Sequence, residues 1–171
     1  MLVKTSELEI RQASPTDIPT LLELIRALAE YEKLAQTMTG TPEALEVHLF
    51  GDRPYAEAVL AELSGKAIGF ALFFPSYSTF LTQPGIYLED LFVLFDYRGQ
   101  GIGKALFTYV AKLAASRGCG RLEWSVLDWN EPAIAFYQRM GATVLPDWRT
   151  CRMTGEALID LAGCSTLNET R

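Results

Sequence analysis

The stretch YRGQGIGKALFTYV, residues 97–110, decides how the rest of the chain is interpreted. It places glycines at 99, 101 and 103 directly before a helical pattern of apolar residues. Glycines let successive backbone N–H groups turn toward one point, and a helix N-terminus favours negative charge there. Arg98 adds a forked donor that suits phosphate oxygens. The stretch therefore predicts a loop that binds phosphate or pyrophosphate.

Two common nucleotide-binding loops do not fit this stretch. A Walker A loop places Ser or Thr after its Gly-Lys pair, whereas Lys104 is followed by Ala105. A dinucleotide-binding fingerprint would need glycine at position 104. The remaining alternative is a glycine-rich turn that binds nothing. Three alternating glycines beside Arg98 at a helix start argue against that alternative.

Hydrophobic periodicity and turn residues around the loop predict a single mixed α/β domain. Strands are expected over 8–13, 56–63, 67–74, 86–93 and 121–127, with weaker candidates at 142–145 and 149–153. Helices are expected over 15–31, 42–50, 102–117 and 131–140, with a last short one from 155. The expected domain covers residues 1–163, and 164–171 are expected to form a disordered tail.

Composition limits the classes of function. The chain has 171 residues, is 49% hydrophobic and carries a net charge of −6, which disfavours nucleic-acid binding. No stretch approaches a membrane span, and no secretory signal is visible at the N-terminus. The three cysteines and the single histidine form no metal-ligand spacing. We therefore expect a cytoplasmic protein that binds neither metal, membrane nor nucleic acid.

Several blocks of sequence resemble the GNAT superfamily of N-acetyltransferases, in its diamine acetyltransferase branch. They are RGQGIGKA (98–105), AEYEKL (29–34), YLEDLFV (87–93), VLDWNEP (126–132), FYQRMGA (136–142) and GEAL (155–158). That branch comprises the spermidine/spermine N1-acetyltransferases and the thialysine N-epsilon-acetyltransferases, and this chain looks more like the thialysine type. The resemblance implies a GNAT fold with a mixed, mostly antiparallel sheet of six to seven strands flanked by helices.

The resemblance also implies acetyl-CoA as co-substrate and assigns residues to it. The backbone at Leu91, Phe92 and Val93 would pair with pantetheine, and an N–H there would face the thioester oxygen. The loop would hold the pyrophosphate, and the start of the helix after residue 130 would contact CoA. Besides the three strand residues, the candidates for contact with CoA are Arg98, Gly99, Gln100, Gly101, Ile102, Gly103, Lys104, Asn130, Pro132, Ala133 and Tyr137. Asn130 is equally well explained as a helix cap.

Glu89 and Asp90 stand inside the apolar run 86–93. Such a strand is expected to be covered on both faces, and period-two geometry sends the two carboxylates to opposite faces. A buried carboxylate without partners is costly, so each should have a salt bridge or a function. In the functional interpretation Glu89 binds the amine of the acceptor or removes its proton, and Asp90 helps to hold the substrate's charge.

Tyr137 is assigned by the resemblance as the general acid that protonates the CoA thiolate. A core tyrosine on an amphipathic helix is the structural alternative. Further acceptor-binding candidates carried over from the resemblance are Tyr31, Glu32, Glu123, Trp124, Ser125 and Trp148.

The leading hypothesis is an acetyl-CoA-dependent N-acetyltransferase acting on thialysine, a lysine-like amine or a polyamine, by direct attack in a ternary complex. A protein lysine or N-terminal acetyltransferase and a non-catalytic CoA-binding sensor are the alternatives. The resemblance also implies a homodimer.

Overall fold

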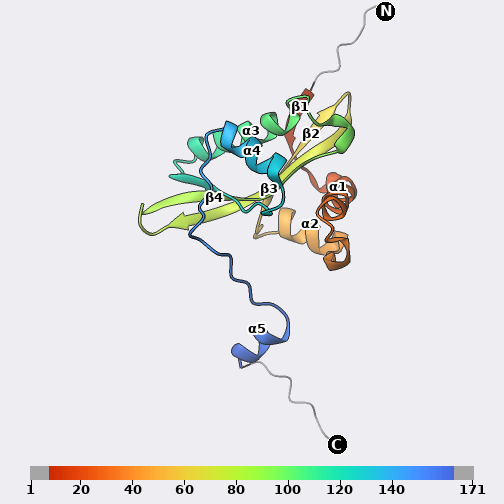
Figure 1. Ribbon diagram of the computed structural model, residues 1–171. Coiled ribbons are helices and arrows are strands. Elements are labelled where there is room, and N and C mark those ends of the chain that lie inside the picture. Colours follow the sequence, from red (N-terminus) through yellow and green to blue (C-terminus); the bar gives the residue numbers. More distant parts are fainter. Residues whose placement is uncertain (1–7, 164–171) are drawn as a thin grey trace, which may run out of the picture. The chain divides into compact units, whose positions relative to one another are not determined.

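A mixed sheet of five strands is the framework of the first part of the chain (Figure 1). The strands are β1 (Leu8–Gln12), β2 (Glu57–Leu63), β3 (Lys66–Ser78), β4 (Gln83–Val93) and β5 (Arg121–Glu123). They lie side by side in this order, antiparallel from β1 to β4, whereas β5 runs parallel to β4. The computed structural model describes residues 8–163. The predicted mixed, mostly antiparallel sheet is confirmed.

The expectation of six to seven strands is wrong, because residues 8–163 contain five. The weaker candidates 142–145 and 149–153 form no strand, and the strand expected to reach residue 127 ends at Glu123. Short apolar alternation does not make a strand unless a neighbour accepts its backbone hydrogen bonds. Residues 143–153 are exposed along their whole length, so apolar burial does not hold them in a sheet.

Among the described residues, five α-helices form close to the predicted starts, although the first begins at Ile18, after a 3-10 turn at Pro15–Asp17. They are α1 (Ile18–Tyr31), α2 (Pro42–Phe50), α3 (Ile102–Ser116), α4 (Glu131–Arg139) and α5 (Glu156–Leu161). The side chain of Thr41 accepts a hydrogen bond from the N–H of Ala44 at the start of α2. Asn130 does the same for Ala133 at the start of α4. These caps are local features, which explains why the sequence located the helix starts so well.

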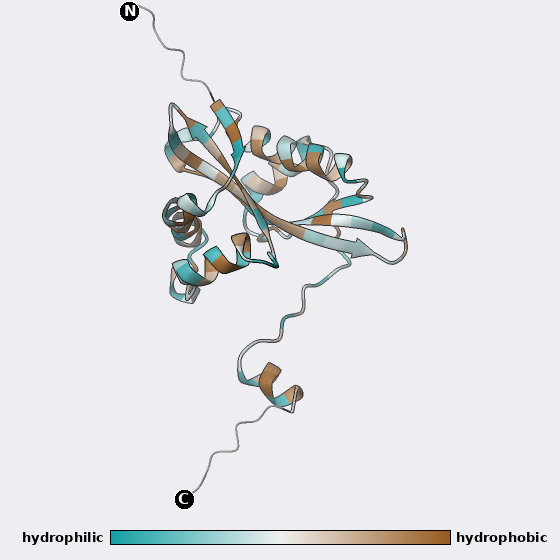
Figure 2. Cartoon of the chain, turned by 180° about the vertical axis from the view of Figure 1, so that it is seen from behind, coloured by the Kyte–Doolittle hydropathy of each residue, from teal (hydrophilic) through white to brown (hydrophobic). Residues whose placement is uncertain are grey.

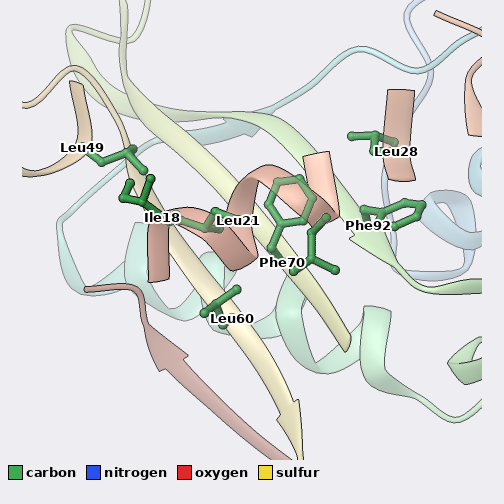
Figure 3. Packing of buried hydrophobic residues seen from close by; sticks show 9 residues of the cluster. Ile18, Leu21, Leu28, Leu49, Leu60, Phe70 and Phe92 are labelled. Carbon is green, nitrogen blue, oxygen red and sulfur yellow. The ribbon is translucent and has the colours of Figure 1, made fainter. Parts of the chain in front are cut away.

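Helices cover both faces of the sheet. On one face, α1 and α2 enclose a core with the sheet, and Figure 3 shows side chains of α1 directed at Leu60, Phe70 and Phe92. On the other face, α3 buries five side chains, including Leu106 and Val110. Figure 2 shows hydrophobic positions alternating with hydrophilic ones along these helices. Full burial of a leucine or phenylalanine contributes about 1.5 to 3 kcal/mol, so this core supplies the main stabilisation.

The described chain divides into two compact units at residues 125 and 126. The first unit contains the sheet with α1, α2 and α3, and the second contains α4 and α5. The prediction of one domain over 1–163 stays a prediction. The predicted tail, 164–171, lies outside the described residues. No helix within residues 8–163 is long and apolar enough to cross a membrane.

Candidate functional site

The sheet is open along the second half of β4. β5 pairs with β4 only from Gly85 to Tyr87. Beyond Tyr87, no strand in the described part of the chain pairs with β4 on that side. Residues 88–93 therefore present backbone donors and acceptors that another extended molecule could pair with.

The direction of the backbone groups on this edge follows from one hydrogen bond. Leu94 donates its N–H to the carbonyl oxygen of Ile68, on the β3 side, at 2.9 Å. Backbone groups alternate along an antiparallel strand, so the N–H groups of Leu91 and Val93 point toward the open edge. Both residues lie in the segment to which the family resemblance assigns the pairing with pantetheine.

The glycine loop follows directly after this edge and leads into α3. Gly99 and Gly101 have φ angles of 76° and 81°, in the left-handed region that side chains disfavour. A Cβ atom at either position would meet nothing within 4 Å, so the space in front of the loop is open. Gly101 caps α3, whose first N–H groups have no acceptor within the helix. The loop therefore has the conformation of an anion cradle.

Arg98 is fixed by contacts within the protein. Its Nε donates a hydrogen bond of 2.9 Å to the carbonyl oxygen of Val93, on the open edge of β4. Its guanidinium carbon lies 4.2 Å from the centre of the Tyr31 ring, and 5.4 Å from that of Phe92. The side chain thus joins the end of β4 to the end of α1. Its assignment as a phosphate donor stays a prediction.

A β-bulge occurs where the two candidate carboxylates stand. Leu88 pairs with Phe73 of β3 and Asp90 pairs with Leu72, so Glu89 has no partner in the register. A bulge interrupts the alternation of side chains along a strand. The expectation that Glu89 and Asp90 point to opposite faces assumed strict alternation, which the strand does not keep.

Asp90 is the carboxylate with the unusual environment. It is half-buried and forms no hydrogen bond or ion pair within residues 8–163, whereas Glu89 is exposed. Burial and the neighbouring charges of Glu89 and Glu32 raise the pKa of Asp90 to about 7. Burial also raises the pKa of Glu32, which directly follows α1. The structure therefore brings together three of the predicted acceptor-binding carboxylates.

The candidates at the end of β5 are held by other contacts. Glu123 pairs with Arg121 at 2.8 Å. Trp124 packs its ring edge-on against Phe107, with the ring centres 5.1 Å apart. The hydroxyl of Ser125 lies 2.7 Å from that of Tyr87, on β4. Each of these side chains has a structural contact, and their acceptor-binding roles stay predictions.

The second unit carries the remaining candidates. Asn130 is buried and caps α4, as the alternative interpretation expected, and Pro132 and Ala133 lie in the first turn. Tyr137 is half-buried on α4 and packs against Phe136. Trp148 is 77% exposed. The proton-donor role of Tyr137 stays a prediction.

No group of three or more histidine, cysteine or acidic side chains is arranged to hold a metal ion among the described residues. Sequence reasoning missed two features of the site, namely the bulge at Glu89 and the contact between Arg98 and Tyr31. Both depend on segments far apart in the sequence. The run of aromatic residues around Arg98 was the only local signal for the second feature.

Comparison with known proteins identifies the family. The profile described as the acetyltransferase (GNAT) family matches residues 23–142. A thialysine N-epsilon-acetyltransferase of Bos taurus is 40% identical, over 90% of this chain and 96% of its own length. An L-ornithine N5-acetyltransferase of Arabidopsis thaliana is 37% identical, over 87% of this chain and 85% of its own.

Solved structures show the same fold. An integron cassette protein from the mobile metagenome of V. cholerae superimposes with a TM-score of 0.76 at 26% identity, over 91% of this chain and 97% of that one. An aminoglycoside acetyltransferase from a soil metagenome gives 0.74 at 20% identity, over 87% of this chain and 97% of its own. The chain therefore belongs to the GNAT family of acetyltransferases, in the branch that contains the thialysine N-epsilon-acetyltransferases, and is an acyltransferase.

Proposed function

We propose that this enzyme transfers the acetyl group of acetyl-CoA to the primary amine of a small cationic acceptor, by direct attack in a ternary complex. The observation that carries the proposal is one continuous arrangement in the first unit. An open strand edge runs into an anion-binding loop, and a carboxylate with a raised pKa lies on the same strand.

The residues at this edge suit acetyl-CoA. GNAT acetyltransferases use it as co-substrate, and when bound it supplies the acetyl thioester. The glycine loop and the first turn of α3 would hold the pyrophosphate, with open space in front of Gly99 and Gly101. The edge of β4 would pair with pantetheine, which leaves the N–H groups of Leu91 and Val93 available to stabilise negative charge on the thioester oxygen.

The acceptor is proposed from charge and from the names of the relatives. Those names give the N-epsilon amine of thialysine and the N5 amine of L-ornithine as acceptors. Both are primary amines on short chains, which are cationic at neutral pH. Glu32, Glu89 and Asp90 form an acidic group that would attract such a cation. A polyamine would be attracted in the same way.

Proton transfers complete the proposed reaction. An alkyl ammonium with a pKa of about 10.4 has to lose a proton before its nitrogen can attack. Glu89, which is exposed beside Asp90, is proposed to accept this proton directly or through water. The amide bond forms as the thioester C–S bond breaks, and Tyr137 is proposed to return a proton to the sulfur.

The test is release of CoA from acetyl-CoA with a panel of acceptors: thialysine, L-ornithine, lysine, spermidine, spermine, putrescine and a lysine peptide. We expect turnover with one or more of the small amines and the lowest KM for the preferred one. The Tyr137→Phe variant, which loses only a hydroxyl, should fall about 100-fold or more in kcat.

Two other outcomes would replace the proposal. Turnover with the lysine peptide alone would indicate a protein acetyltransferase. Binding of CoA in calorimetry without turnover on any acceptor would indicate a CoA-binding sensor.

The homodimer and the cytoplasmic location also stay proposals. Sedimentation at micromolar concentration tests the first, and a species of only 19.0 kDa would contradict it.

A further inference from the structure

Arg98 makes two contacts that belong to different sides of the proposed reaction. Its Nε binds the carbonyl oxygen of Val93, the last residue of β4, at 2.9 Å. Its guanidinium lies over the ring of Tyr31, the last residue of α1, at 4.2 Å. Phe92 and Phe95 complete an aromatic surround, with ring centres at 5.4 and 5.8 Å.

The contact with Val93 acts on the side of the thioester. Val93 directs its backbone groups toward the open edge, next to where pantetheine is proposed to pair. A charged donor on that carbonyl fixes the end of the strand, and such hydrogen bonds are among the stronger ones in proteins. The N–H of Val93 is part of the same backbone, so its direction depends on this contact.

The contact with Tyr31 acts on the side of the amine. The ring of Tyr31 also lies 6.4 Å from that of Phe92, so α1 ends against β4 through aromatic packing. Glu32 directly follows Tyr31, and its charge acts on Asp90. Arg98 thus supports the helix end that carries one of the three acceptor-binding carboxylates.

We propose that Arg98 is a positioning residue. It holds the thioester-binding end of β4 in a fixed position relative to the amine-binding end of α1, and it is not a ligand of the CoA pyrophosphate. This inference rests on the proposed function. Its face and its Nε are both used within the protein, which leaves a phosphate only the outer edge of the guanidinium. The backbone N–H groups of the glycine loop would then carry the pyrophosphate.

The experiment compares two acetyl donors, acetyl-CoA and S-acetylpantetheine, which has no pyrophosphate. A residue that binds pyrophosphate matters only for acetyl-CoA. For Arg98→Ala we expect kcat/KM to fall by the same factor with acetyl-CoA and S-acetylpantetheine, about tenfold to a hundredfold. Arg98→Lys keeps a charge but not the planar fork, so it should show a smaller fall that is again equal for the two acetyl donors. We also expect KM for the amine to rise, because Tyr31 and Glu32 lose their support. Arg98→Gln, which keeps a donor for Val93, should recover part of kcat but not the KM for the amine.

A matched control is Lys66→Ala, because Lys66 lies over the ring of Tyr97 at 5.5 Å and takes no part in the site. This variant should change kcat/KM neither with acetyl-CoA nor with S-acetylpantetheine. A double-mutant cycle with Tyr31→Leu sharpens the test. The effects of Arg98→Ala and Tyr31→Leu on KM for the amine should be less than additive, because one contact is removed twice.

Two results would overturn the inference. One is a loss confined to acetyl-CoA, with S-acetylpantetheine unaffected, which would make Arg98 a pyrophosphate ligand. The other applies even if the parent acetylates no amine. Hydrogen exchange reports directly on the end of α1, where Glu32 and Leu34 donate to Leu28 and Ala29. Unchanged exchange of these amides in Arg98→Ala would show that Arg98 does not hold the helix end.

Discussion

Two clusters of carboxylates at different strands of the sheet behave in opposite ways. At β1, Arg11 binds both Asp17 and Glu62, and its guanidinium lies 2.8 Å from Asp17. These contacts hold the pKa of Asp17 well below its usual range. At β4, burial and the charges of Glu89 and Glu32 raise the pKa of Asp90 to about 7.

The different surroundings of Asp17 and Asp90 indicate that the first carboxylate stabilises the fold and that the second is suited to a function. Asp17 is buried, accepts a hydrogen bond from the N–H of Ser14 in the capping box of the turn before α1, and is paired with Arg11. Such a group stabilises the fold as long as it is ionised. Within residues 8–163, no side chain forms an ion pair with Asp90, and the charges of Glu89 and Glu32 oppose its ionisation. A cationic acceptor is the partner that the proposed function provides.

The largest effect is expected on catalysis at β4. Glu89→Gln keeps the shape of the side chain and removes its charge and basicity. We expect kcat/KM for the amine to fall about 100-fold or more, as for loss of a general base, with no loss of melting temperature. Steady-state kinetics at saturating acetyl-CoA measure this loss. If kcat/KM of the variant stays within threefold of the parent's, Glu89 is not the proton acceptor, and Asp90 or Glu32 would be assigned that role instead.

The next effect is on stability at β1. Arg11→Met leaves the carboxylates of Asp17 and Glu62 without their cation, at half-buried to buried positions. We expect the free energy of unfolding to fall by about 2 to 3 kcal/mol, near the lower end for broken buried pairs. Denaturant titration measures this value. Activity per folded molecule should stay the same, and a selective loss of activity would contradict the comparison.

A third prediction uses the pH dependence of Asp90. Its pKa is raised from 3.8 to about 7, so the folded chain binds more protons than the unfolded one between these values. The free energy of unfolding therefore falls as the pH rises through this window, because the carboxyl of Asp90 ionises less easily in the folded chain than in the unfolded one. Asp90→Asn removes the loss, so this variant should gain stability over the parent at pH 8 and not at pH 4. Melting temperatures at the two pH values test this sign.

The same variant has an opposite effect on binding. KM for the cationic amine should rise about tenfold at pH 8, because the charge that holds it is absent. In the parent, KM for the amine should rise as the pH falls below 7, whereas in Asp90→Asn it should stay flat. KM for acetyl-CoA serves as the internal control, since it does not depend on this carboxylate.

How far the sequence predicted this molecule depends on the range of the interactions. Helix starts at Thr41 and Asn130 were predicted because a cap is decided within four residues. The glycine loop was predicted for the same reason. The number of strands was not, because 142–145 and 149–153 have the right residues but no partner strand.

The candidate site shows the same limit. Sequence reasoning found Glu32, Glu89 and Asp90, and gave Glu89 the main role and Asp90 a supporting one, whereas the structure gives Asp90 the more unusual environment. The bulge at Glu89 arises from the register between β3 and β4, which no local pattern specifies. Arg98 was assigned to phosphate from its position beside the loop. Its contact with Tyr31 appears only once α1 is packed on the sheet.

The smallest predicted effect tests whether the acids at β4 act as one group. Glu32 contributes to the raised pKa of Asp90 through its charge, and burial raises its own pKa. Glu32→Gln removes that charge, so the pKa of Asp90 should fall, by less than removal of Glu89 would lower it, because Glu32 is the smallest of the three causes. The pH below which KM for the amine rises should shift down by the same amount.

Glu30→Gln is the matched control, because Glu30 is exposed on α1 and does not act on Asp90. An equal shift in both variants would mean that general surface charge, rather than a group built around Asp90, sets its pKa. No shift in either variant would leave burial and Glu89 as the causes, and Glu32 would then have no part in binding the amine.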